Sequence, residues 1–153
     1  MPASRFVYVI YIRTTPERLW LALTEPALTR QYWCETTQES DWKPGSSWRI
    51  LTPDGRIADD GEILEIEPAK RLVITWQHQL KEEMRAEGFS RLTYEFSPMG
   101  DAVRFELTHT IDVSESKLIA AVSSGWPMIL CSLKSLLETG ESLVETRRWP
   151  EGM

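Results

Sequence analysis

Between positions 114 and 140 the apolar residues recur every three or four positions. They are Leu118, Val122, Trp126, Ile129, Leu130, Leu133, Leu136 and Leu137. This spacing places them on one side of an α-helix. Ser114 can cap the first turn, and Gly140 can take the left-handed conformation that ends a helix. The sequence therefore predicts a long amphipathic helix, which needs a broad apolar surface to cover.

Pro127 interrupts this pattern. A proline lacks the backbone N–H, and its ring crowds the carbonyl four residues earlier. We therefore expect a kink or a short break near residues 123–125. Two interpretations are open: two consecutive helices, or a hinge over a cavity. The first is favoured, because kinks at proline are often only structural.

The chain before this helix has the pattern of strands with short turns. Aromatic and β-branched runs predict strands at residues 5–13, 46–51, 59–67, 71–79, 91–98 and 102–112. Thr15-Pro16-Glu17 and Pro26 are typical helix starts, so two short helices should follow the first strand. Residues 68–70 suit a hairpin connection, whereas 81–87 are expected to be a solvent loop and 142–153 a frayed tail.

Alternation along three of these strands predicts one apolar face and one polar face. The apolar face would carry Leu72, Ile74, Trp76, His78, Leu80, Leu92, Tyr94, Phe96, Val103, Phe105, Leu107, His109 and Ile111. The polar face would carry Thr75, Gln77, Thr93, Glu95, Arg104, Glu106, Thr108 and Thr110. The long helix should cover the apolar face. For the first strand both faces are apolar, so its buried side stays open.

Composition narrows the class of protein. The 153 residues suit a single domain spanning 1–153, and the net charge of −6 disfavours nucleic acid as a partner. No uninterrupted run of about 18 apolar residues occurs, so we expect no membrane insertion. Cys34 and Cys131 lack CxxC spacing, and the N-terminus has the pattern of a strand rather than a signal peptide. These features favour a cytoplasmic protein with reduced thiols.

The order of elements resembles a known family. Residues 14–33, 72–77, 92–96, 103–110 and above all 125–140 are similar to the START-like (SRPBCC) superfamily, in the branch named after the C-terminal domain of the activator of heat-shock protein 90 ATPase. The resemblance implies an α+β helix-grip fold, in which a curved antiparallel sheet of about six strands wraps around the C-terminal helix. It also implies an internal cavity for a hydrophobic ligand, since members of the superfamily bind lipids, sterols or polyketides.

Residues expected to line such a cavity lie on the predicted apolar faces. They are Trp33, Trp48, Ile50, Ile74, Trp76, His78, Tyr94, Phe96, Phe105, His109, Val122, Trp126, Ile129 and Leu130. An aromatic wall with a few polar groups suits a flat apolar ligand, although the same rings also suit a packed core. His78 and His109 could bind a ligand or act as a general base, or each could bond a backbone carbonyl or water.

The function predicted is binding of a hydrophobic small molecule, with no catalysis assigned. One alternative is an enzyme of the cyclase or dehydratase kind that uses His78 or His109 with Tyr94. Another is a protein that regulates a chaperone ATPase or acts with a stress-response partner. A homodimer also stays open. No metal site or cofactor is expected, because the ligand spacings of zinc and the glycine-rich nucleotide loops do not occur. Glu62, Glu65, Glu67, Glu82, Glu83 and Glu87 are expected in solvent.

Overall fold

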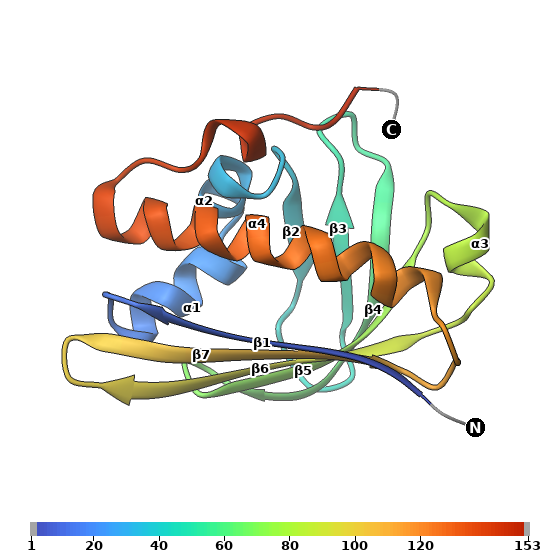
Figure 1. The fold of residues 1–153 in the computed structure, drawn as a ribbon, viewed down its shortest axis with the longest axis horizontal. Helices are drawn as coiled ribbons and strands as arrows, with labels where there is room; N and C mark the ends of the chain where they lie inside the picture. Colours follow the sequence, from blue (N-terminus) through green and yellow to red (C-terminus); the bar gives the residue numbers. More distant parts are fainter. Residues whose placement is uncertain (1–2, 152–153) are drawn as a thin grey trace.

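The computed structural model describes residues 3–151, and there one strongly curved antiparallel sheet wraps around the long helix α4 (Figure 1). The strand order is β1-β7-β6-β5-β4-β3-β2. The strands are β1 (Ser4–Ile12), β2 (Thr37–Ser40), β3 (Ser47–Leu51), β4 (Ile57–Glu67), β5 (Arg71–His78), β6 (Ser90–Met99) and β7 (Ala102–Ile111). The helices are α1 (Pro16–Thr24), α2 (Pro26–Tyr32), α3 (Glu82–Arg85), α4 (Lys117–Thr139) and the short 3₁₀ helix η1 (Val144–Thr146).

The predicted fold class is confirmed, with seven strands where the sequence indicated about six. The missed strand is β2, whose sequence TQES has no apolar alternation. It is held by a buried amide instead: Gln38 donates to the carbonyl of Leu23 over 2.9 Å and accepts the indole N–H of Trp48 over 2.9 Å. A polar residue with both amide groups satisfied can replace an apolar one in a core, and no hydrophobic pattern marks it.

The predicted division of the sheet into an apolar and a polar face is confirmed for β6 and β7, where burial alternates residue by residue. In β5 the alternation is incomplete, because Val73 on the other face is buried as well. The structure also decides the question left open for β1. Ile10 and Ile12 face the core, whereas Val7, Val9 and Tyr11 are exposed on the outer side.

Helix α4 runs unbroken from Lys117 to Thr139, so a short break near residues 123–125 and the interpretation as two consecutive helices are both wrong. A kink there stays a prediction. Pro127 leaves the carbonyl of Ser123 without its helical partner, but Ser123 is exposed, and water can bind that carbonyl. The predicted cap is also displaced by two residues. Ser116, not Ser114, accepts the N–H of Ile119 over 3.1 Å. Gly140 ends the helix as predicted, with φ of 88° and its N–H on the carbonyl of Leu136.

By length and composition alone, α4 would qualify as a membrane-spanning helix. An uninterrupted run of about 18 apolar residues does not occur in α4, because serines interrupt it. Core helices of soluble proteins pass the same test. In this fold α4 lies over the concave side of the sheet, where Leu118, Trp126, Leu130 and Leu133 are buried (Figure 1).

Two segments expected to be irregular are ordered. The predicted solvent loop at 81–87 contains α3, although Glu82 and Glu83 are exposed as expected. The predicted frayed tail packs back on the molecule through η1. Thr146 is buried, its hydroxyl lies 2.6 Å from that of Ser132 on α4, and its carbonyl accepts the N–H of Cys34 over 2.7 Å. The tail's polar composition hid this contact, which satisfies buried polar groups on both sides. Residues 152 and 153 lie outside the described residues.

Strand β4 pairs irregularly with both of its neighbours. The pairing of β4 with β5 shifts by one residue between Ile63 and Glu65, and the pairing of β3 with β4 shifts between Ile50 and Leu51. Such bulges bend a strand and increase its twist. Gly61 lies between them at a close approach of the two backbones. A Cβ added there would lie 1.8 Å from the carbonyl oxygen of Thr75. Only glycine fits this position.

Candidate functional site

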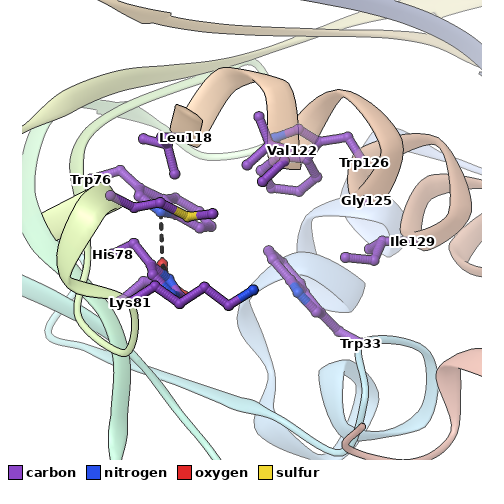
Figure 2. Close-up of a pocket in the computed structure, with 12 residues that line it drawn as sticks. Trp33, Trp76, His78, Lys81, Leu118, Val122, Gly125, Trp126 and Ile129 are labelled. Carbon is purple, nitrogen blue, oxygen red and sulfur yellow. Dashed lines mark hydrogen bonds and ion pairs between the residues drawn. The ribbon is translucent and has the colours of Figure 1, made fainter. Parts of the chain in front are cut away.

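A cavity of about 200 Å³ lies between α4, α3 and the ends of β4 and β5 (Figure 2). We call it the α3–α4 cavity. It is lined by Trp33, Asp59, Trp76, His78, Lys81, Met84, Leu118, Ala121, Val122, Gly125, Trp126 and Ile129. Lys81 and Ala121 are exposed, whereas Trp76, Trp126 and Asp59 are buried, so the cavity leads from solvent towards the core.

Three tryptophans from three separate elements form the wall of this cavity. Trp33 follows the last turn of α2, Trp76 lies on β5, and Trp126 lies in the middle of α4. The ring centroids of Trp33 and Trp126 are 5.3 Å apart, those of Trp76 and Trp126 are 5.6 Å apart, and both pairs are edge-to-face. These separations are the favourable ones for aromatic pairs, so the wall is rigidly packed before any ligand enters.

The polar end of the cavity is built on Asp59. Its Oδ1 accepts the indole N–H of Trp76 over 2.9 Å and lies 2.8 Å from Nδ1 of His78. An ionised carboxylate only accepts hydrogen bonds, so Nδ1 of His78 carries the proton towards Asp59. Nε2, the other ring nitrogen, is buried without a partner in the protein. His78 lines the cavity, so the cavity is where this nitrogen can find one.

Asp59 carries an acidic group inside an aromatic environment. Burial raises the pKa of Asp59, and the hydrogen bonds from His78 and Trp76 oppose this rise. The sequence analysis did not select Asp59. The sequence did contain a signal for an acidic partner of His78. The predicted hairpin of residues 59–67 and 71–79 brings the two aspartates that begin its first strand opposite His78. Simple pairing across residues 68–70 would place Asp60 there, and the bulge in β4 shifts Asp59 into that position instead.

His109, the second predicted histidine, is fully buried and lies beside this cavity rather than on it. The indole N–H of Trp126 donates to its Nδ1 over 3.1 Å, so the ring proton is on Nε2. That N–H donates to the hydroxyl of Ser90 over 2.8 Å, and Ser90 in turn donates to the carbonyl of Trp76. Burial lowers the pKa of His109 to about 3. Both ring nitrogens are therefore committed, and the ring is neutral.

The structure brings six of the fourteen predicted lining residues to the α3–α4 cavity: Trp33, Trp76, His78, Val122, Trp126 and Ile129. The other eight lie in the packed core between α4 and the sheet: Trp48, Ile50, Ile74, Tyr94, Phe96, Phe105, His109 and Leu130. Tyr94, for example, packs against Phe105 and Trp126 at 5.2 and 6.3 Å. A ligand contact at these eight residues stays a prediction.

Sequence reasoning missed Lys81 and Met84, which come from α3 and its preceding residue. They lie in the segment expected to be a loop. A four-residue helix is too short for its sequence to show which surface it covers. Within residues 3–151, the ammonium group of Lys81 has no carboxylate oxygen within 4 Å, and no three His, Cys, Asp or Glu side chains are arranged to hold a metal ion. The chemical groups that line the cavity are thus one carboxylate, one imidazole, one ammonium group and an aromatic wall.

Solved structures with the same fold come from several organisms. DynU16, described as a protein in the dynemicin biosynthetic locus, is 19% identical with a TM-score of 0.75; the match covers 97% of this chain and 51% of DynU16. The Aha1 dimer from Colwellia psychrerythraea is 21% identical (TM-score 0.69; 91% and 99% covered). An HSP90 activator from Plasmodium falciparum is 21% identical (TM-score 0.70; 87% and 95% covered). At these identities the likeness shows the fold alone.

No curated protein sequence is significantly similar to this chain. The comparison with protein families identifies the family, because its match extends from the helix pair α1 and α2 into α4. Residues 13–138 match the family described as "Activator of Hsp90 ATPase homolog 1-like protein", and the chain belongs to that family.

Proposed function

We propose that this protein binds a small, mainly apolar molecule with an aromatic ring in the α3–α4 cavity. The observation that carries the proposal is the cavity itself: about 200 Å³ with a wall of three tryptophans and one polar end. An apolar cavity of about 150 Å³ is enough to hold benzene. The volume here therefore suits a single ring with one or two small substituents, or one end of a longer molecule that extends past Lys81.

The wall supports aromatic rather than purely aliphatic ligands. A ring lying against the wall of Trp33, Trp76 and Trp126 can adopt the same edge-to-face geometry that Trp33 and Trp76 each make with Trp126. Their packing also fixes the wall in place. A preorganised site binds more tightly, because binding does not have to order the side chains first.

The alternatives from the sequence have unequal support. For an enzyme of the cyclase kind, His109 has no free ring nitrogen and Tyr94 does not line the cavity, so of these three residues His78 is the one that could serve as a base there. A chaperone partner or a second copy of the chain rests on the family and on neighbours whose descriptions name an HSP90 activator and a dimer. Both stay predictions for this chain.

The seven indole N–H signals provide a direct test. Titration with toluene, followed by ¹H–¹⁵N NMR, should shift the signals of Trp33, Trp76 and Trp126. Trp42, which does not line the cavity, should stay in place and serve as the internal reference. If the three cavity signals do not move at saturating toluene, the cavity does not bind aromatic rings and the proposal is wrong.

A matched pair of variants adds a control. Gly125 lines the cavity with nothing within 4 Å of an added Cβ, so Gly125→Leu should fill it and weaken toluene binding at least tenfold. Ala120 lies on the exposed side of the same helix, so Ala120→Leu should leave the affinity unchanged. Equal binding by both variants would place the toluene site elsewhere.

A further inference from the structure

His78 has an unusual position for a surface-proximal histidine. Its Nδ1 is held at 2.8 Å by a buried carboxylate, and that carboxylate is itself fixed by the indole of Trp76. The ring cannot rotate without breaking this bond, so Nε2 keeps a fixed direction. A buried polar atom without a hydrogen bond is costly, and such atoms in native structures call for a partner. The side of the ring that lacks one is on the α3–α4 cavity.

The charges around the cavity restrict the chemistry of that partner. The charged or titratable residues that line it are Asp59, His78 and Lys81. Asp59 is already engaged by two donors, whereas the ammonium group of Lys81 lies at the exposed end. In Figure 2 the Lys81 side chain extends in the direction of Trp33 across the lower side of the cavity. A cationic ligand would meet this like charge, whereas an anionic or acidic ligand would be attracted by it.

Resting on the function proposed above, we propose that the α3–α4 cavity selects an aromatic molecule with an acidic oxygen, such as a phenol, an enol or a carboxylic acid, whose oxygen pairs with Nε2 of His78. Such a group satisfies Nε2 wherever the proton lies. The neutral acid donates its O–H to the neutral imidazole, and the anion accepts an N–H from the imidazolium. While the imidazole is neutral, ethers, esters and hydrocarbons of the same shape can offer no proton to Nε2, so this nitrogen remains unpaired when they bind.

Matched probes separate this inference from the proposed function. The affinities of 4-methylphenol, 4-methylanisole and toluene are measured by the same NMR titration of the cavity tryptophans. We expect 4-methylphenol to bind at least tenfold more tightly than 4-methylanisole. In His78→Phe, which keeps an aromatic ring but has no nitrogen, the preference should fall below twofold.

Each result has one meaning. If none of the three probes binds, the proposed function fails and this inference fails with it. If 4-methylanisole and toluene bind as tightly as 4-methylphenol, the cavity binds aromatic rings without recognising an acidic oxygen. The inference about His78 is then overturned, whereas the proposed function stands. A phenol preference that survives in His78→Phe also overturns it, because another group would then recognise the oxygen.

The wild-type protein offers a second measurement that needs no variant. Long-range ¹H–¹⁵N spectra of the two imidazoles report the state of each ring nitrogen. Addition of 4-methylphenol should shift the Nε2 signal of His78, whereas 4-methylanisole should not. His109, with both nitrogens bonded inside the core, is the internal control and should not respond to either probe. An unchanged His78 signal at saturating phenol would contradict the inference even if His78→Phe does not fold.

Discussion

The indole N–H of Trp126 donates a hydrogen bond to Nδ1 of His109 over 3.1 Å, which ties the middle of α4 to β7 inside the core. One turn of the helix is thereby fixed against the sheet by a polar contact, next to the aromatic wall of the cavity. Because both groups are buried, the contact also fixes which ring nitrogen of His109 carries the proton. The protein's response to pH should depend on this pair.

We expect acid to destabilise the fold through His109. Its pKa is about 3 when folded, against 6.5 for an ordinary histidine, so below pH 6.5 the unfolded chain takes up a proton that the folded chain refuses. The contribution of neutral His109 to the free energy of unfolding is fully retained above pH 6.5 and is lost as the pH falls towards 3. Between pH 6 and 4 the free energy of unfolding should fall by about 1.4 kcal/mol per pH unit from this group.

Urea unfolding at a series of pH values, compared between the wild type and His109→Gln, isolates this contribution. The glutamine amide can accept from Trp126 and donate to Ser90 but does not titrate. Asp59 and the surface carboxylates titrate in both proteins and therefore cancel in the difference. Parallel pH curves for the two proteins would show that His109 is not a buried neutral ring.

A second prediction concerns the close approach at Gly61. Gly61→Ala should lower the free energy of unfolding by roughly 3 kcal/mol, because the new Cβ would clash with the backbone of Thr75, which cannot move independently of β5. Gly125→Ala is the matched control. It lies within α4 with open space around it, so it should stabilise the helix by about 0.5–1 kcal/mol. Thermal unfolding that ranks the two variants in the opposite order would rule out this geometry for β4.

A third prediction concerns the start of α4. Ser116→Ala should cost about 1 kcal/mol of stability, because the hydroxyl accepts the N–H of Ile119 and donates to Glu87. Ser114→Ala should be nearly neutral, since Ser114 is exposed and lies before the helix. Chemical denaturation of both variants distinguishes the observed cap from the one that the sequence pattern suggested. A larger loss for Ser114→Ala would contradict the structure at this point.

Glu87 adds a pH dependence to this cap. Burial raises the pKa of Glu87, but the hydrogen bonds from Ser116 and from the N–H groups of Lys117 and Leu118 outweigh it, so the net shift is downward. The stabilisation is therefore present above the ordinary pKa of a glutamate and is lost as the pH falls through the lowered value. The destabilisation caused by Glu87→Gln should accordingly be smaller in acid than at neutral pH, as the same denaturation series would measure.

Local patterns in the sequence were enough to predict the outline of this fold. Helix α4 follows from residues spaced by three and four, its end from Gly140, and the strands β4 to β7 from alternation between turn residues. These signals are local, because helix and strand periodicities depend on neighbours within a few positions. The sequence pattern did not predict strand β2 or the docked tail. Both are held by buried polar groups, such as Gln38 and Thr146, that no hydrophobic pattern reveals.

The candidate site was decided by the tertiary structure. The sequence indicated that His78 and Trp76 share an apolar face, and it singled out Trp33 and Trp126, but it could not say which aromatic rings pack solidly and which leave space. That depends on how α2, α3 and α4 meet above the sheet. Asp59 reaches His78 only because a bulge in β4 shifts the pairing by one residue. A one-residue shift moves each side chain to the opposite face of a strand, and no local pattern along the chain fixes it.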